Sequence, residues 1–504
     1  MSKLTITLNY LNFSVKSEDD RIIRSIDYVC SKLTSYTYTF NKHTKRVHKQ
    51  PDKAYYVYDP IENVYRYPIT LLKPFMATLG HNGIKREDIE VINNKNDNTN
   101  AIIKFTPNEK YELRDYQREA IDIFMRDIKK RIMLLDLFTG AGKSLVSSRF
   151  VYEYQKRVAF ILLPKYIKKW IADLKEYINV EDEDIYVVQG DDSLIELMEE
   201  EDISYKVIIF SIPTITNYLK NYETREVNYP VQPYELMNHL GVGAIINDET
   251  HNFFHALTRA ICYFDAEICI CSSATLDSNQ KEVRALYQNV IPEENRITNL
   301  TKQEPYVYMM PIEYRLEFNK NIKFKRNQGY NHILYEQSLI KNGIALKSYF
   351  EMVLYYIETR FFKKRCPEDK AAIFFASVDM CNLFTNYIKK KYPNENIYRY
   401  IGGDDYHTML NSNIIITNHS MLGTGIDIKN LTFVLQTVSA SSLQANVQNF
   451  GRLRKIEGKE VWYYYIYTND IKNQYRMHRD RFEAVKRKCK DIFFVEYPKL
   501  IRTR

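Results

Sequence analysis

The sequence lacks several features that would assign it to other classes of protein. No apolar run in its 504 residues approaches the length that crosses a membrane, and its first residues alternate like a strand instead of resembling a signal peptide. Its seven cysteines are scattered and odd in number, which argues against a disulfide framework. We therefore expect an intracellular, cytoplasmic protein with no membrane partner.

A zinc site is not indicated either. Cys269 and Cys271 lie two residues apart, a spacing that places both side chains on the same face of a strand. No second pair of cysteines or histidines at zinc-ligand spacing accompanies them. We predict that both thiols are core residues.

The positive charge of the chain is moderate but unevenly distributed. The net charge is +8, and residues 1–105 carry 16 Lys and Arg against 11 Asp and Glu, an excess of +5. Residues 471–504 carry 11 against 4, an excess of +7. A local basic excess indicates a polyanionic partner, although any one lysine-rich run is more often a solvated surface. For the C-terminal segment both interpretations stay open.

The first 105 residues have the pattern of a small α+β domain. Helical spacing at 20–33 and 68–79 is interspersed with strand patterns at 4–13, 36–40, 54–58 and 64–67. A basic loop, 41–49, lies among tyrosines, and its composition suits phosphate contacts as well as an ordinary solvated loop. The polar run 93–100 is a plausible linker to the next domain.

The rest of the chain alternates apolar strands with helical segments, the signature of doubly wound α/β lobes. We predict a first lobe over 106–300 and a second over 301–504, connected through 292–305. The predicted strands are 132–135, 159–163, 207–211, 244–247 and 268–272 in the first lobe, and 371–376, 397–400, 413–417, 432–436 and 461–467 in the second. Residues 462–467 (WYYYIY) could form a base-stacking platform, but their alternation favours a buried strand.

Residues 134–145, LLDLFTGAGKSL, have the pattern of a phosphate loop between a strand and a helix. Gly140 and Gly142 would let backbone N–H groups approach phosphate oxygens, and the helix N-terminus favours negative charge. Lys143 would reach the β- and γ-phosphates, and Ser144 would ligate Mg²⁺. The strict motif has a glycine where this chain has Leu137, so a glycine-bearing turn with an exposed lysine is the alternative.

A second constellation follows the apolar strand 244–247. Asp248 would hold Mg²⁺, and Glu249 would orient the attacking water as general base. Phosphoryl transfer also needs a cation at the γ-phosphate, which the segment 448–455 (QNFGRLRK) would supply from the second lobe. The alternative for the acidic pair alone is a surface turn.

The order of these motifs resembles that of the superfamily 2 (DExH-type) helicases and translocases. The matching segments are 113–117 (Q-motif), 139–144 (motif I), 248–251 (motif II), 273–275 (motif III), 423–427 (motif V) and 448–454 (motif VI). The resemblance implies an α/β protein with two tandem RecA-like lobes, after the small α+β N-terminal domain. It also implies ATP and Mg²⁺ as cofactors and nucleic acid as the partner.

The resemblance implies functional roles for the residues at matching positions. It implies catalytic roles for Lys143, Asp248, Glu249, Arg452 and Arg454, and Mg²⁺ ligation by Ser144 and Asp248. The implied ATP-binding residues are Arg114, Gln117, Thr139, Gly140, Ala141, Gly142, Lys143, Ser144, Gly425 and Asp427, with Gln117 reading the adenine. Residues implied to couple the ATP site to nucleic acid are His251, Ser273, Thr275 and Gln448. For His251 a structural role is the alternative.

The implied nucleic-acid track consists of sugar–phosphate contacts, because a motor must tolerate any sequence. By family position its residues are Pro164, Lys165, Ser211, Thr214, Ser377 and Thr417, each of which could instead cap a strand or helix end. Motif VI departs from the family pattern: Lys455 stands at the second arginine position, and Arg454 comes one residue early. We expect Arg454 to act there, since a planar guanidinium clamps phosphate bidentately.

Within the superfamily the chain most resembles the UvsW-type phage helicases. The features that support this resemblance are the chain length, Asn247 before the DExH box, the spacing through 424–426 and 429–431, and the N-terminal domain with its basic loop. This resemblance implies a DNA helicase that remodels forked or branched DNA in phage recombination, repair or replication, in an infected host cell. An RNA helicase and a duplex DNA translocase without strand separation stay open as alternatives.

Overall fold

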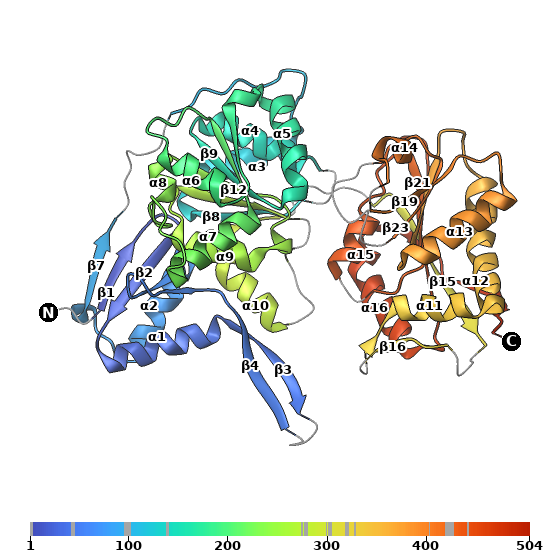
Figure 1. Cartoon of the computed structure of the whole chain (residues 1–504), viewed down its shortest axis with the longest axis horizontal. Helices are drawn as coiled ribbons and strands as arrows, with labels where there is room; N and C mark the ends of the chain where they lie inside the picture. The colour runs from blue at the N-terminus through green and yellow to red at the C-terminus, as the bar shows by residue number, and fades with distance from the viewer. Residues whose placement is uncertain are drawn as a thin grey trace. The chain divides into compact units, whose positions relative to one another are not determined.

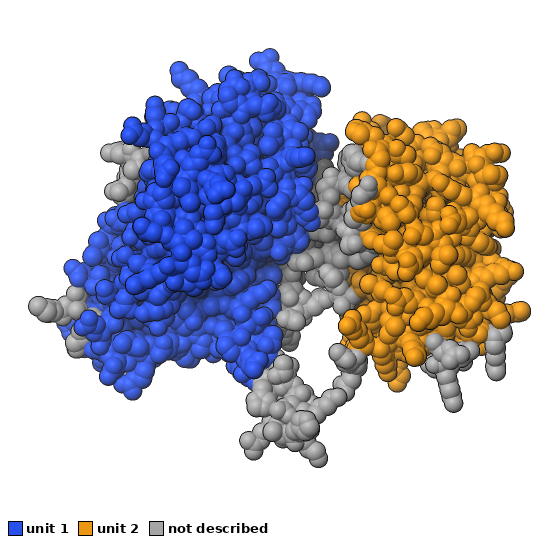
Figure 2. Space-filling view, in the orientation of Figure 1, with its two compact units in different colours: residues 1–301 blue, residues 302–504 orange. Residues whose placement is uncertain are grey.

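The computed structural model describes residues 4–41, 46–94, 102–137, 141–273, 276, 281–298, 300, 305–317, 322–326, 329–402, 404–418, 428–440 and 443–503. The chain forms two compact units, residues 1–301 and 302–504, which Figure 2 shows in blue and orange. Among the described residues, no helix has the length and apolar character that crossing a membrane requires.

The N-terminal region is built on a five-stranded sheet with the order β5-β6-β2-β1-β7. Its strands are β1 (Leu4–Leu8), β2 (Asn12–Ser17), β5 (Val57–Asp59), β6 (Val64–Pro68) and β7 (Ile89–Asn93). Helix α1 (Asp20–Lys32) begins where the Asp19 carboxylate accepts hydrogen bonds from the first backbone N–H groups, and α2 (Leu72–His81) follows β6. The apolar spacing along α1 buries Ile22 and Ile26 against the sheet.

A hairpin of β3 (Thr34–Asn41) and β4 (Arg46–Ala54) extends from this region as a separate two-stranded ribbon (Figure 1). The predicted basic loop at 41–49 is therefore wrong in part, because residues 46–49 belong to β4; residues 42–45 lie outside the described residues. The predicted strand 54–58 is likewise divided between β4 and β5. The sequence of β4 is polar and contains Pro51, which pairs with Tyr36 next to a register shift, so no alternation marks the strand.

The N-terminal sheet is fastened to the first lobe through buried hydrogen bonds. The backbone N–H groups of Tyr10 and Leu11 donate to Oδ1 of Asp265 at 2.8 and 3.1 Å. Nδ2 of Asn12 donates to the carbonyl oxygens of Ile261 and Phe264 at 3.0 and 3.1 Å. Side chains of both regions form one hydrophobic cluster. Removing the N-terminal region would therefore expose the core of the first lobe, and its status as a domain of residues 1–105 stays a prediction.

The first lobe contains a seven-stranded sheet in the order β10-β11-β9-β12-β13-β8-β14, in which every pairing is parallel. Its strands are β8 (Ile132–Leu135), β9 (Val158–Leu162), β10 (Ile185–Val188), β11 (Val207–Ser211), β12 (Ala244–Asn247), β13 (Ile268–Ser272) and β14 (Arg296–Ile297). All five predicted strands are confirmed. The two edge strands β10 and β14 were missed, because one is only half-buried and the other has two residues.

The second unit contains an eight-stranded sheet whose main order is β19-β20-β18-β21-β22-β15-β23, with β24 also paired to β15. Its strands are β15 (Val307–Leu316), β18 (Lys370–Phe375), β19 (Ile397–Tyr400), β20 (Ile414–Asn418), β21 (Leu431–Gln436), β22 (Val461–Tyr467), β23 (Cys489–Ile492) and β24 (Val495–Ile501). The five predicted strands are confirmed. The pairings are parallel, so two tandem RecA-like lobes are confirmed as the fold class.

Burial confirms two further predictions. Cys269 and Cys271 are fully buried in β13, with their sulfur atoms 3.9 Å apart on one face. Strand β22 is buried except at Trp462, which is half-exposed. The basic C-terminal segment holds helix α16 (Lys472–Val485), in which Arg481 is buried and donates to Oδ1 of Asn446 at 2.9 Å. This arginine therefore joins α16 to helix α15 (Leu443–Phe450).

Candidate active site

The carboxyl edge of the first lobe's sheet brings together the predicted ATP-site residues. Strands β8, β12 and β13 are neighbours or near neighbours and parallel, so the segments that follow them begin at the same edge. Helix α4 (Lys143–Tyr154) starts after β8, whereas Asp248 and Glu249 follow β12. Thr139 and Gly140 lie outside the described residues.

Gly142 is the one loop glycine that the structure describes, and two constraints require it. Its φ of 80° lies in the left-handed region, and a Cβ at this position would come within 2.4 Å of Nε2 of Gln117. That nitrogen donates to the carbonyl oxygen of Ala141 at 2.8 Å, and the Tyr116 hydroxyl donates to the same oxygen at 2.9 Å. Oε1 of Gln117 accepts from the Arg114 N–H at 2.9 Å. The Q-motif residues thus support the phosphate loop directly.

Two ammonium groups lie at the start of α4. Nζ of Lys143 donates to the carbonyl oxygen of Leu137 at 3.2 Å, and Nζ of Lys169 donates to Oγ of Ser144 at 3.1 Å. Lys169 also forms an ion pair with Asp173 at 3.1 Å. A helix N-terminus flanked by cations suits a polyphosphate.

Three donors orient the buried carboxylate of Asp248. Its Oδ1 accepts from Oγ of Ser272 at 2.7 Å and from the Glu249 N–H at 2.9 Å, while its Oδ2 accepts from Nε1 of Trp170 at 3.1 Å. Trp170 is fully buried in α5 (Pro164–Ile178). Sequence reasoning missed Trp170 and Ser272. Only the position of Ser272 directly before motif III could have indicated a role.

Glu249, His251 and Ser273 form a connected group. Glu249 has a φ of 51°, an unusual left-handed conformation for a residue with a side chain. Nδ1 of His251 lies 3.3 Å from Oε2 of Glu249 and 2.9 Å from Oγ of Ser273. Burial, together with the charges of Lys143 and Lys165, lowers the pKa of His251 to about 4. The imidazole is therefore neutral at pH 7 and connects motif II to motif III; Thr275 lies outside the described residues.

The six predicted track residues occupy two different environments. Pro164 and Lys165 lie largely exposed at the start of α5. Partial shielding of the Lys165 ammonium from water lowers its pKa, and the charge of Glu249 opposes that shift. The other four are buried, and each hydroxyl has an intramolecular hydrogen bond. These bonds join Ser211 to Thr214 at 2.7 Å, Ser377 to Oε2 of Glu336 at 2.7 Å, and Thr417 to the Tyr400 carbonyl oxygen at 2.6 Å. Their roles in the track stay predictions.

Motif VI lies in the second unit, at and after the end of α15. Arg452 is buried, whereas Arg454 is half-buried and donates to the carbonyl oxygen of Gly451. Lys455 is exposed. The side chain of Gln448 lies outside the described part of the chain, as do Gly425 and Asp427.

The donor set at the carboxyl edge fits Mg²⁺. Ser144 offers a hydroxyl oxygen and Asp248 two carboxylate oxygens, which are the hard ligands that this ion prefers. Its remaining ligands in such sites are usually water and nucleotide phosphates. The three groups that donate hydrogen bonds to Asp248 are neutral. They orient the carboxylate without neutralising its negative charge.

Comparisons with known proteins found one family match and several similar solved structures. Residues 110–278 match the family described as "Type III restriction enzyme, res subunit". Among solved structures, "The crystal structure of T4 UvsW" is 15% identical over 100% of both chains, with a TM-score of 0.37. "S. cerevisiae Dbp5 bound to RNA and ADP BeF3" is 12% identical over 77% of this chain and 90% of that one, with a TM-score of 0.48. None of the curated proteins matched. The segment that matches the family covers about a third of the chain and holds the phosphate loop and the acidic pair of motif II.

Proposed function

We propose that this chain is an ATP-driven DNA helicase or translocase that remodels forked or branched DNA. The observation that carries the motor assignment is the meeting of Lys143, Ser144, Asp248 and Glu249 at one edge of a parallel sheet. This edge is the usual ligand position in α/β folds. Phosphoryl transfer needs little covalent chemistry and depends on positioning and charge neutralisation, which these residue types supply.

In the proposed mechanism, Lys143 neutralises the β- and γ-phosphate oxygens, and Glu249 orients the attacking water and accepts its proton. Mg²⁺, held by Ser144 and Asp248, would neutralise developing charge on the phosphates. Neutral His251 keeps Glu249 and Ser273 connected, so a change at the phosphates can reach motif III. Arg452, with Arg454 as the second candidate, supplies the cation of the second lobe.

The branched-DNA part of the proposal rests on the β3–β4 hairpin. Its sequence from 42 to 49, KHTKRVHK, is strongly basic, and the ribbon extends away from the five-stranded sheet (Figure 1). Lys49 and Lys53 are exposed on β4, and Nζ of Lys49 lies 3.8 Å from the ring centre of Tyr36. The N-terminal sheet beside the ribbon is hydrogen-bonded to the first lobe. A basic ribbon attached to the motor lobe in this way suits contacts with the phosphates of a duplex junction.

The test is the rate of ATP hydrolysis with no nucleic acid, single-stranded DNA, blunt duplex, a four-way junction and single-stranded RNA, at one salt concentration. We expect DNA to stimulate hydrolysis and the junction to stimulate it most. A Lys49→Glu/Lys53→Glu variant should lose the junction preference while keeping its basal rate. Lys73→Glu, an exposed change on α2, is the matched control. Equal stimulation by RNA and DNA, or by junction and plain duplex, would overturn the branched-DNA proposal.

A duplex DNA translocase without strand separation is the second candidate. The family description names a restriction enzyme subunit, and this is the observation that favours it. Release of a labelled strand from a forked duplex separates the two candidates. Duplex-stimulated hydrolysis without strand release would support the translocase.

A further inference from the structure

A pocket of about 270 Å³ lies in the second unit, at the amino ends of its parallel strands. Asp369 directly precedes β18, Thr432 lies near the start of β21, and Trp462 lies near the start of β22, and all three line the pocket. Motifs V and VI follow the carboxyl ends of β20 and β21. The pocket is therefore at the sheet edge opposite to the one that carries the motor motifs.

Aromatic rings form the apolar walls of this pocket. Phe361 and Phe433 lie on one side, with ring centres 5.5 Å apart. Trp462 of the neighbouring strand β22 also lines the pocket. Tyr308 of β15 stacks on the Trp462 ring, with ring centres 4.9 Å apart and an interplanar angle of 21°. Strand β22 lies between β21 and β15, and the Trp462 ring also lies 5.7 Å from that of Tyr464 and 5.6 Å from that of Phe493. Trp462 lines the pocket and is the one residue of β22 that is partly exposed.

Cations line the same pocket from a π-helical segment, Ile357–Phe362, and the turn after it. Such segments are rare and frequently occur at functional sites. Nε of Arg360 is buried and has no hydrogen-bond partner among the described residues. Nζ of the exposed Lys364 lies 6.0 Å from the Trp462 ring centre. Arg365, also in the lining, is paired with Glu395 at 2.5 Å.

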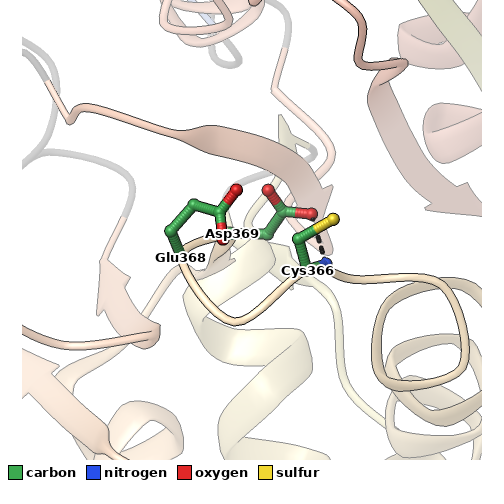
Figure 3. A group of neighbouring side chains, drawn as sticks. All are labelled: Cys366, Glu368 and Asp369. Atoms are coloured by element: carbon green, nitrogen blue, oxygen red, sulfur yellow. Dashed lines mark hydrogen bonds between the residues drawn. The ribbon is translucent and has the colours of Figure 1, made fainter.

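The carboxylates around the pocket are already bonded to neighbouring groups. Figure 3 shows Cys366, Glu368 and Asp369 grouped at one corner, where Oδ2 of Asp369 accepts from the Cys366 N–H at 2.8 Å. Nζ of Lys459 pairs with Glu368 and with Asp369, the latter at 2.6 Å, so an ammonium already neutralises this corner. Glu460 accepts from Nε1 of Trp462 at 2.9 Å. Among the described residues, Arg360 and Lys364 are the lining cations that no carboxylate pairs.

We propose that this pocket binds one nucleotide unit, with its base against the part of Trp462 that lines the pocket and its phosphate contacted by Arg360 and Lys364. Base–aromatic stacking combined with cations is how proteins hold single strands without reading their sequence. The volume of about 270 Å³ lies just below the usual range of small-ligand pockets, so the pocket would hold no more than one nucleotide unit. This contact is additional to the proposed motor function and does not require ATP hydrolysis.

The experiment is a titration of the full chain, without ATP, followed by tryptophan fluorescence. The chain has only two tryptophans, and Trp170 is buried beside Asp248 at the ATP site, so quenching that remains in Trp462→Phe reports on that site and not on the pocket. The two probes are the oligonucleotide (dT)₁₂ and the mononucleotide dTMP. Comparing them shows whether the bound nucleotide unit belongs to a strand or to a free nucleotide. We expect saturable quenching by (dT)₁₂ that Trp462→Phe abolishes.

Charge variants provide a second test that does not depend on whether the Trp462→Phe variant folds. Lys364→Glu should weaken the quenching affinity by at least about tenfold, as expected for loss of a phosphate contact with reversal of its charge. Lys390→Glu, an exposed change on α13 (Val378–Lys391) in the same unit, should leave it unchanged. Quenching by dTMP alone would support the site with a free nucleotide as its ligand. No quenching by either probe, or quenching that Lys364→Glu leaves intact, would overturn the proposal, whatever the ATPase assay shows.

Discussion

The two RecA-like lobes both bury a carboxylate near the carboxyl edge of their sheets, and the two carboxylates have different partners. In the first lobe, Asp248 accepts from Trp170 and Ser272 beside the phosphate loop. In the second, Glu336 of helix α11 (His332–Lys341) accepts from the Ala376 N–H at 2.8 Å and from the N–H and hydroxyl of Ser377, both at 2.7 Å. Glu336 thus secures the start of α13, whereas Asp248 is presented at the phosphate-loop edge.

The comparison shows that a buried carboxylate is not by itself the sign of a catalytic site. Burial raises the pKa of Glu336 to about 7, against the opposing effect of its hydrogen bonds to Ala376 and Ser377. A strongly shifted pKa is often taken to indicate function, but structural networks shift pKa values as well. The neighbourhood of a phosphate loop, and not burial, distinguishes Asp248.

The largest effect is expected from variants of the ATP site in the first lobe. Lys143→Ala or Glu249→Gln should nearly abolish ATP hydrolysis, because one removes charge neutralisation and the other removes the base. Melting temperatures should stay close to that of the unchanged protein. Lys168→Ala, an exposed change on α5, serves as control in the same steady-state assay. Normal turnover in either variant would contradict the assigned site.

The second lobe's contribution is tested at motif VI. Losing the arginine finger should lower kcat on the order of 10³-fold or more, because it removes transition-state charge stabilisation. We expect this loss in Arg452→Lys and a smaller one in Arg454→Lys, measured with saturating ATP and DNA. The reverse ranking would place the finger at Arg454.

The residues that donate hydrogen bonds to Asp248 provide a more specific test, with a smaller expected loss of activity. Trp170→Phe keeps a ring but removes the N–H, and Ser272→Ala removes the hydroxyl. A hydrogen bond to a charged group contributes about 1.5–3 kcal/mol, so ATPase activity at limiting Mg²⁺ should fall roughly 10- to 100-fold. Lys168→Ala, an exposed change on the same helix as Trp170, should not alter this activity. Unchanged Mg²⁺ dependence in both donor variants would show that these residues only support the core.

Glu336 gives the corresponding test in the second lobe. Its pKa of about 7 exceeds the ordinary value of 4.5, so the folded protein keeps a proton that the unfolded chain releases between these pH values. The free energy of unfolding should therefore fall as pH rises from about 4.5 to about 7, by about 3 kcal/mol. Urea melts should show that Glu336→Gln removes this part of the pH dependence. The exposed change Glu351→Gln should retain it.

The smallest effect concerns His251. With its pKa at about 4, its contribution to stability is present above about pH 6.5 and is lost as pH falls toward 4. Lys165→Gln should raise the pKa of His251 by a fraction of a unit, because a like charge is removed. NMR titration of the imidazole measures this shift, and Lys168→Gln is the control. An unchanged pKa would show that Lys165 does not act on His251.

Strands and turns with strong local signals were predictable from the sequence. Most of the ten strands predicted in the two lobes are short apolar runs, as expected for strands covered on both faces. Strand β15 was missed although it pairs with strands on both sides, because its sequence VYMMPIEYRL is interrupted by Pro311 and Glu313. Strand β4 was missed because its pairing partner, and not a hydrophobic core, holds it.

The sequence by itself determined the fold class, the order of the motifs and the residue types at the phosphate loop and motif II. These features depend on neighbours within a few residues along the chain, where hydrophobic runs and turn residues act directly. The tertiary structure decided which buried groups serve the site. Trp170 reaches Asp248 across 78 residues and Glu336 reaches Ser377 across 41, because packing of helices onto the sheets brings them together. The same packing left Trp462 facing a pocket instead of the core.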